Sequence, residues 1–177
     1  MYIAIGLGIL LFIIIISYFV SNHNKFKFAI IEIDEAENNI EVLLQKKIDL
    51  INRTIPIIKK ELKLDSFLDD MNFLNNSTIN HFEMYNHLCL INNQLMETLD
   101  ENEKLFKSVQ LVNILDEIKD TDEDIDGSIK FYNDSVTEFN KLIVSFPSNI
   151  IATISRYKRK EFYNNETREM FDIINDK

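Results

Sequence analysis

The sequence is poor in residues that break helices and in residues that build catalytic centres. Its 177 residues include three glycines, two prolines, one cysteine, three histidines and no tryptophan. Because glycine and proline interrupt regular structure, so few of them favour long helices with short connections. Apolar residues recur at steps of three and four, and the alternation typical of strands is scarce. The sequence therefore predicts an all-α protein.

The same scarcity excludes several kinds of site. With Cys89 as the only cysteine, no disulfide can form within the chain. Its neighbours Leu88 and Leu90 predict a buried, unreactive thiol. His81 and His87 are six residues apart, whereas two metal ligands on one helical face are three or four apart. The three glycines form no phosphate-binding loop. We therefore expect no catalytic residue, no cofactor and no enzymatic activity.

Negative charge dominates the composition, with 29 Asp and Glu against 19 Lys and Arg and a net charge of −10. Because nucleic-acid phosphates require basic partners, this balance argues against nucleic acid as a ligand. The acidic residues concentrate in an acidic run at residues 116–126. Four basic residues gather between 156 and 160, so we interpret residues 156–177 as a basic and polar tail that is solvated or touches an anionic lipid or acidic partner.

Residues 2–20 carry no charge and are rich in isoleucine and leucine. At about 1.5 Å per helical residue, they come close to the ~30 Å thickness of bilayer hydrocarbon. A cleaved signal peptide is the alternative, but no basic residue precedes the run and no small-residue cleavage site follows. We predict a single-pass anchor in the cell membrane at residues 1–22. Lys25 and Lys27 follow it, and the positive-inside rule then places the remainder in the cytoplasm.

Three long amphipathic helices are predicted in a bundle domain at residues 23–155, with Pro56 bending the first. Short turns would make the helices antiparallel, as in an up-down-up bundle or coiled coil. The third helix would then end far from the membrane, where the basic residues would meet a protein rather than lipid. The apolar faces run over Ile30–Leu62, over Phe82–Leu99, and from Leu105 through Val109, Val112, Leu115 and Ile118 to Ile129.

Local signals predict where these helices begin and end. Ser66 is expected to cap a short helix that reaches Leu74, and residues 75–78 form a polar turn. The run Asp100-Glu101-Asn102-Glu103 has the form of a capping box and is expected to start the third helix. Pro147 should end that helix, and Ser148 should cap a short helix after it.

Two asparagines and three aspartates are the polar residues of most interest on the third helix. Asn133 and Asn140 are seven residues apart beside the apolar face, and we interpret them as fixing helix register by hydrogen bonds across the bundle. A docking surface is the alternative. Asp122, Asp124 and Asp126 match the first positions of a calcium-binding EF-hand loop, but its twelfth position lacks the required glutamate. A solvated acidic helix face is the preferred interpretation.

Two blocks of the sequence resemble the LemA family. Residues 33–60 contain the family's basic pair followed by Asp-Leu-Ile, and residues 131–163 follow its "YNDAV…YN…FPSNLIA…F" pattern. Asn52 stands where the family usually has proline, and residues 65–99 match only in pattern. The resemblance implies a membrane-anchored helical bundle and no particular reaction. The motif residues, candidates for an interaction surface, are Tyr132, Asn133, Asp134, Asn140, Phe146, Pro147, Ser148 and Asn149.

We therefore expect a non-enzymatic scaffold or adaptor that acts through contacts of its helix surfaces. The bilayer is its first partner, through residues 2–20. The resemblance implies a protein partner as well, a membrane protein or a peptidase, and a homo-oligomer is compatible with the pattern. The alternative function is a calcium-responsive membrane module that uses the acidic run at residues 116–126.

Overall fold

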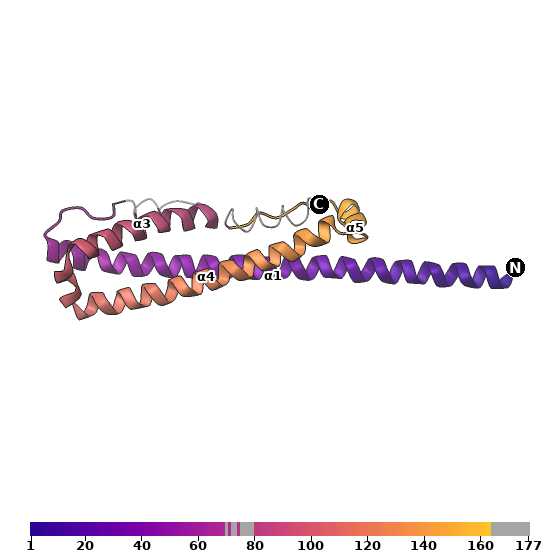
Figure 1. Ribbon diagram of the computed structural model, residues 1–177, viewed down its shortest axis with the longest axis horizontal. Coiled ribbons are helices and arrows are strands. Elements are labelled where there is room, and N and C mark those ends of the chain that lie inside the picture. The colour runs from indigo at the N-terminus through magenta and orange to yellow at the C-terminus, as the bar shows by residue number, and fades with distance from the viewer. Residues whose placement is uncertain (70, 72–73, 75–79, 164–177) are drawn as a thin grey trace. The chain divides into compact units, whose positions relative to one another are not determined.

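The computed structural model describes residues 1–69, 71, 74 and 80–163, and every regular element among them is helical. The all-α class predicted from the scarcity of glycine and proline is confirmed (Figure 1). Of the short helix predicted after Ser66, Met71 and Leu74 are helical and buried, and the turn predicted at 75–78 lies outside the described residues. The elements are α1 (Tyr2–Leu62), α3 (His81–Glu101), the 3₁₀ segment η1 (Glu103–Lys107), α4 (Val109–Val144) and α5 (Ser148–Ser155).

The chain divides into two compact units, and α1 and α4 each contribute to both. Unit 1 comprises residues 1–36 and 131–177, and unit 2 comprises residues 37–130. The anchor predicted from the sequence is therefore the first part of a single helix that continues through Pro56 to Leu62.

Unit 2 is held together by aliphatic side chains at helical spacing. Leucine and isoleucine recur every three or four residues on one side of each helix, so that three apolar faces meet in one core. Each face alone would leave its stripe exposed to water, and mutual burial is what stabilises the helices. The buried residues include Ile40, Leu44, Ile48, Ile51 and Ile58 of α1, Leu88, Ile91, Leu95 and Leu99 of α3, and Leu111, Ile114, Ile118 and Ile125 of α4.

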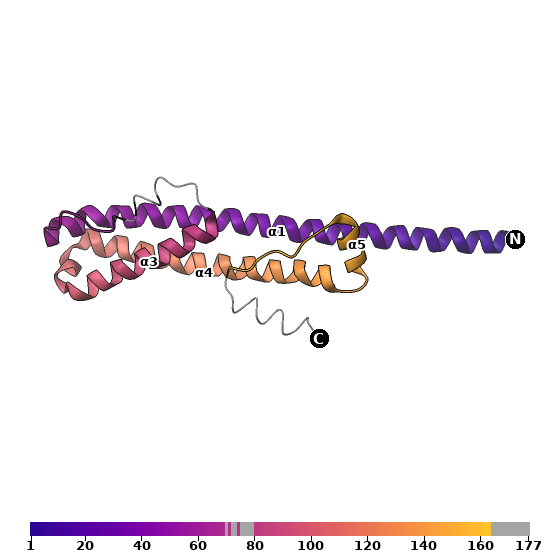
Figure 2. The same ribbon diagram turned by 90° about the horizontal axis from the view of Figure 1, so that it is seen from above.

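The helices of unit 2 do not alternate in direction as expected. Here α4 runs antiparallel to α1, but α3 runs in the same direction as α1 (Figure 1 and Figure 2). The expectation assumed short turns, whereas residues 63–80 separate the end of α1 from the start of α3, which is enough chain for α3 to start beside the middle of α1 rather than at its end. Three side-chain hydrogen bonds show that α1 and α4 pair in antiparallel orientation: Asn39 with Ser128, Lys47 with Asp122, and Arg53 with Glu117.

The predicted capping box is not a helix start. Asp100 lies in the last turn of α3, which ends at Glu101, and η1 separates α3 from α4. The cap of α4 is Ser108, whose Oγ accepts the N–H of Leu111 at 3.3 Å. The side of α4 that faces the core in its first turns therefore differs from the predicted one. Val109 is 74% exposed, and Leu111 is buried. Val112 and Leu115 are only half-buried, and Ile114 takes their place in the core. From Ile118 to Ile129 the predicted face is the buried one.

Unit 1 has an aromatic core immediately after the apolar run. Phe26 of α1 is fully buried; its ring stacks on Tyr157 with centroids 4.9 Å apart and meets Phe139 of α4 edge-on at 5.9 Å. Ile151 and Ala152 of α5 are also buried. The end of α4, α5 and the following residues thus pack beside the residues that directly follow the apolar run, and the expectation that they lie far from it was wrong.

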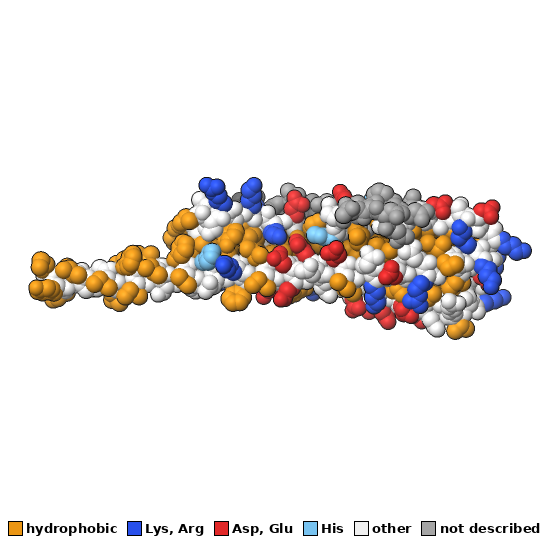
Figure 3. Space-filling view, turned by 180° about the vertical axis from the view of Figure 1, so that it is seen from behind, with side chains coloured by type: hydrophobic (Ala, Val, Ile, Leu, Met, Phe, Trp, Pro, Cys, Tyr) orange, Lys and Arg blue, Asp and Glu red, His pale blue; other side chains and the backbone are white. Residues whose placement is uncertain are grey.

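Residues 2–20 of α1 are exposed throughout their length. Among the described residues, α1 is the helix that is long and apolar enough to cross a membrane, by length and composition. Figure 3 shows apolar side chains covering this part of the helix. Because each buried apolar Å² is worth about 25 cal/mol, leaving such a surface in water is unfavourable.

Candidate functional site

Lys47 of α1 is a charged residue inside the core of unit 2. Only 6% of it is exposed, and its Nζ lies 2.5 Å from Oδ1 of Asp122 on α4. Removing an ammonium group from water costs several kcal/mol unless an anion compensates it. The ion pair therefore explains why Asp122 interrupts the apolar face of α4, a feature that the sequence alone leaves without a reason.

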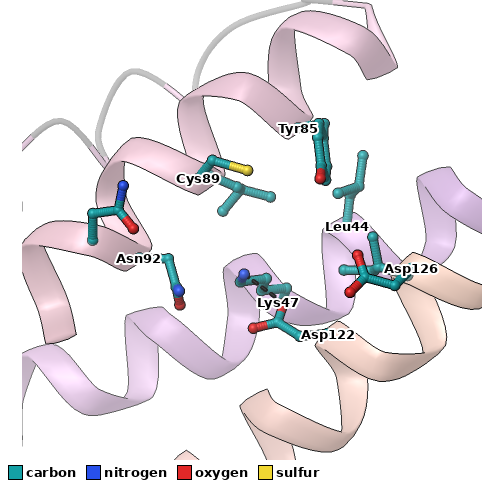
Figure 4. Close-up of a pocket in the computed structure, with 10 residues that line it drawn as sticks. Leu44, Lys47, Tyr85, Cys89, Asn92, Asp122 and Asp126 are labelled. Carbon is teal, nitrogen blue, oxygen red and sulfur yellow. Dashed lines mark hydrogen bonds and ion pairs between the residues drawn. The ribbon is translucent and has the colours of Figure 1, made fainter. Parts of the chain in front are cut away.

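A pocket of about 210 Å³ opens beside this ion pair. Figure 4 shows side chains from all three long helices around it. Its polar groups are one ammonium, two carboxylates, one phenol, one thiol and two amides, with an apolar floor. Such a pocket can accept a small polar molecule by hydrogen bonding. The polar lining residues are Lys47, Tyr85, Cys89, Asn92, Asn93, Asp122 and Asp126.

Tyr85 is the residue of this pocket whose acidity is altered. Burial raises the pKa of its phenol from 10.0 to about 12, with further contributions from Cys89, to which it is hydrogen-bonded, and from the carboxylates of Asp126 and Asp122. The phenol therefore stays protonated at neutral pH and can donate a hydrogen bond but cannot act as a base. Cys89 is half-buried at the pocket wall, which differs from the fully buried thiol expected from its neighbours.

The three aspartates of the EF-hand-like motif lie within the uninterrupted helix α4. Residues two apart on a helix point about 200° away from each other, so Asp122, Asp124 and Asp126 do not converge on one point. Gly127 has no positive φ, and Ser128 Oγ donates to the carbonyl of Asp124 at 2.8 Å, as expected within a continuous helix. Among the described residues, no three His, Cys, Asp or Glu side chains are placed to share a metal ion.

The two asparagines of α4 bind the C-terminal segment, which we define as residues 157–163. Asn140, 1% exposed, donates Nδ2–H to the carbonyl of Lys160 at 3.0 Å, and its Oδ1 accepts the N–H of Lys160 at 2.9 Å. Asn133 Oδ1 accepts the N–H of Tyr163 at 3.0 Å. Tyr132 adds a hydrogen bond from its hydroxyl to the carbonyl of Glu161 at 3.0 Å. These side chains therefore hold backbone groups rather than another helix.

The spacing of the two asparagines matches the segment that they hold. Seven residues of helix cover about 10.5 Å, and the three steps from residue 160 to 163 cover about 10 Å when extended. Asn133 and Asn140 therefore meet Tyr163 and Lys160 in order, as the segment runs back along α4. The interpretation that the asparagines fix register between helices was wrong about the partner, because no pattern in the sequence indicates that the chain returns along α4.

Ser148 also has a different role from the predicted one. It is the first residue of α5, and the N-cap position belongs to Pro147, which makes no side-chain capping bond. Ser148 Oγ instead donates to Oδ1 of Asn22 at 3.2 Å, while Asn22 Nδ2 donates to the carbonyl of Tyr18 at 3.0 Å. Both side chains are buried, so this contact ties α5 to α1 just beyond the apolar run.

The other motif residues lie near these contacts. Phe146 is 80% exposed, Asp134 is exposed, and Pro147 and Asn149 are half-buried at the start of α5. Four of the eight motif residues thus hold unit 1 together: Tyr132, Asn133 and Asn140 bind the C-terminal segment on α4, and Ser148 ties α5 to α1.

The sequence matches the LemA family over residues 36–173. The chain belongs to the LemA family. The match covers unit 2 and the second segment of unit 1, and therefore includes both the Lys47–Asp122 pair and the residues that bind the C-terminal segment. A search of curated proteins and a search of solved structures each found no match.

Three structural residues of this LemA-family chain escaped the sequence analysis. No role was predicted for Asn22 and Phe26, which follow the apolar run. Lys47 was noted only as part of the family's basic pair. A usable signal did exist for Lys47, because it falls among the buried positions Leu44, Ile48 and Ile51 just as Asp122 falls on the apolar face of α4. Opposite charges on two apolar faces favour a buried pair.

Proposed function

We propose that the protein is a membrane-anchored, non-enzymatic scaffold or adaptor that acts through contacts of its helix surfaces. The observation that carries the proposal is that the exposed apolar run continues without a break into the helix that builds both cores. Asn22 and Phe26 are core residues of unit 1, and Asn22 bonds to the carbonyl of Tyr18 within the run. A cleavage at the end of the run would remove part of this support, so the run is better suited to a retained anchor than to a leader.

The anchor is tested on protein isolated from membranes. We expect an intact mass that includes residues 2–20 and resistance to extraction by alkaline carbonate. A mature chain that begins near Ser21, or one released by carbonate, would contradict the anchor.

The proposed orientation places both units in the cytoplasm, supported by the exposed Lys25 and Lys27 after the run. Replacing Cys89 by serine and then Val109, 74% exposed, by cysteine creates a single accessible thiol. A membrane-impermeant maleimide should label this thiol in broken cells and leave it unlabelled in intact cells. Labelling in intact cells would reverse the orientation.

Unit 2 supplies the surfaces proposed for protein contact. Each of its long helices exposes a large apolar side chain: Val42 on α1 is 66% exposed, Leu90 on α3 is 62% exposed, and Val109 lies at the start of α4. Such side chains are common on surfaces that bind protein, although single ones also occur on ordinary surfaces. A membrane protein or a peptidase is the partner class that we propose, and a second copy of the chain is the other occupant.

A photoreactive amino acid at each of these three positions tests the contact in native membranes. The adaptor proposal expects one recurrent membrane protein attached at one of the positions, and loss of that adduct when a neighbouring exposed residue is changed to glutamate. Self-adducts alone would make the protein a homo-oligomeric scaffold. The absence of adducts at all three positions would contradict contact through unit 2.

The alternative of a calcium-responsive module finds no support in α4, because the helix is continuous through Asp122, Asp124 and Asp126. Asp122 is moreover engaged with Lys47. Binding of calcium in an EF-hand geometry would require this part of the helix to unwind and the ion pair to break.

A further inference from the structure

Positive charge is concentrated at one place in this acidic protein. The net charge of the chain is −10, yet residues 21–28 and residues 145–160 contain no Asp or Glu. The same two stretches contain Lys25 and Lys27 in the first and four basic residues in the second. Lys25, Lys27, Arg156, Lys158 and Arg159 are exposed. We call four of them, Lys25, Lys27, Arg156 and Lys158, the basic cluster, because they adjoin Phe26 and Tyr157 in the chain.

Unit 1 brings the two stretches together. Ser148 is hydrogen-bonded to Asn22, and Tyr157 stacks on Phe26. Arg156 and Lys158 flank Tyr157 in the chain, while Lys25 and Lys27 flank Phe26. Figure 3 shows Lys and Arg side chains close to the point where the bare apolar part of α1 ends.

The level of this cluster along α1 is fixed by the helical rise. Asn22 lies about 3 Å beyond Val20, the last residue of the apolar run, and Lys27 lies about 10 Å beyond it. The headgroup layer occupies about 5–8 Å on each side of the hydrocarbon. A helix that spans the bilayer with residues 2–20 therefore places Lys25 within the headgroup layer and Lys27 just beyond it, where a long lysine side chain reaches back to the lipid phosphates.

Helix α5 is apolar on its outer side as well as on its buried side. Ile151 and Ala152 pack into unit 1, while Ile150 and Ile154 are 52% and 64% exposed. Phe146, 80% exposed, lies in the turn that precedes α5. Ile150 and Ile154 are four residues apart in α5 and share one outer face. We call these two side chains, together with the exposed Phe146 at the start of the helix, the α5 outer face. An apolar face bordered by Lys and Arg is typical of helices that lie in a membrane interface.

We propose that the α5 outer face inserts into the interface of the membrane that α1 crosses, and that the basic cluster binds the headgroups of anionic phospholipids. The proposal rests on the membrane anchor of the proposed function. Lipid is favoured as the occupant because the face is continuous with the membrane exit of α1 and because its border is cationic and free of acidic residues. Each Lys or Arg near an anionic surface contributes about 1 kcal/mol to such binding.

The absence of tryptophan from the chain permits a direct test with single tryptophans introduced one at a time. Phe146→Trp reports on the α5 outer face, and Phe12→Trp, within the apolar run, is the positive control. Phe131→Trp is the matched control: Phe131 is 50% exposed on α4 and lies about 20 Å along that helix from its end at Val144. The full chain is reconstituted in vesicles of phosphatidylcholine and phosphatidylglycerol that contain brominated acyl chains, which quench tryptophan on contact.

We expect the tryptophan at position 146 to emit at shorter wavelength than the one at 131 and to lose more than half of its emission to brominated lipid. The tryptophan at 131 should emit as in water and stay unquenched. Equal, water-like emission at 146 and 131 would overturn the proposal. A tryptophan at 146 that is shielded from water but unquenched would also overturn it, because a protein surface would then cover the face.

The charge component is tested with the same reporter. In vesicles of phosphatidylcholine alone, or in high salt, quenching at 146 should fall. Changing all four residues of the basic cluster to glutamine should remove the dependence on phosphatidylglycerol while quenching at 12 persists. If quenching at 146 does not depend on lipid charge either with the native basic cluster or with the four glutamines, the basic cluster does not bind anionic headgroups.

The two proposals fail in different ways. If the chain does not float with vesicles and the tryptophan at 12 is unquenched, the anchor itself is wrong. If the chain floats and the tryptophan at 12 is quenched while that at 146 is not, the anchor holds and the α5 proposal is wrong.

Discussion

The two units of this protein are stabilised in different ways. Unit 2 has an aliphatic core of leucine and isoleucine with one partly buried ion pair, in which Lys47 is buried and the side chain of Asp122 is 33% exposed. Unit 1 has an aromatic core around Phe26, and amide side chains that bind backbone groups of the C-terminal segment. Most of the family motif lies in unit 1. The difference indicates that unit 2 depends on periodic packing, which tolerates exchange among apolar residues. Unit 1 depends on particular polar contacts, which are lost when either partner is replaced.

The largest expected effect comes from breaking the ion pair of unit 2. Asp122→Ala leaves the buried Lys47 ammonium without its anion, and we expect a loss of about 3 kcal/mol in the free energy of unfolding. Urea unfolding in detergent, followed by helicity, provides the measurement. The matched control is Glu117→Ala, which removes the exposed pair with Arg53 at 3.4 Å and should cost less than about 1 kcal/mol.

A second control separates charge from packing. Lys47→Met combined with Asp122→Leu should recover most of the lost stability, because an apolar pair of similar volume needs no compensating charge. If Asp122→Ala and Glu117→Ala destabilise the protein equally, the ion pair has no special role and unit 2 depends on packing alone.

A smaller effect is expected from breaking the amide contact of unit 1. Asn140→Leu removes two hydrogen bonds to Lys160, and we expect a loss of about 2 kcal/mol. The change should appear locally as faster hydrogen exchange at the Lys160 N–H and as proteolysis between residues 157 and 163. Thr137→Leu, half-buried on the same helix, is the control, since the Thr137 hydroxyl bonds only within α4. Unchanged exchange at Lys160 in Asn140→Leu would refute the role of the amide.

A smaller effect still is expected from Tyr85 at high pH. Its folded-state pKa of about 12 lies above the ordinary value of 10.0, so the folded state retains the phenolic proton more tightly. The resulting stabilisation is complete below pH 10 and is lost as pH rises toward 12. Tyr85→Phe should flatten the decline of stability across this interval. An equally steep decline in Tyr85→Phe and in the wild type would contradict the assignment.

The smallest expected effect is that of calcium. Because Asp122, Asp124 and Asp126 lie on a continuous helix, we expect no change in Tm on adding millimolar calcium and no difference between wild type and Asp124→Asn. A rise in Tm that Asp124→Asn abolishes would revive the calcium-responsive alternative.

Periodicity in the sequence predicted the helical class, the span of α3 and the buried face of α4 from Ile118 onward, because helical packing repeats every three to four residues. It failed where one residue decides the outcome. Ser108 rather than Asp100 caps α4. The residues that are buried in the first turns of α4 therefore differ from the predicted ones. The direction of α3 depends on how the chain connects α1 to α3, which the helical periodicity of the long helices does not determine.

Contacts between distant parts of the chain were also beyond the sequence. Asn140 and Lys160 are twenty residues apart, and Asn22 and Ser148 are 126 apart. Nothing in one sequence marks such residues as partners, since neither contact belongs to a repeating pattern. The motif residues were recognised from family resemblance, and their contacts became visible only in the folded chain.

The most direct test of the whole account compares Phe146 of unit 1 with Val109 of unit 2 by photocrosslinking in native membranes. The account predicts that a photoreactive group at 146 attaches to phospholipid, whereas the same group at 109 attaches to a membrane protein or a second copy of the chain. A protein adduct at 146 together with no adduct at 109 would contradict it, because unit 1 would then be the protein-binding region and unit 2 would have no partner.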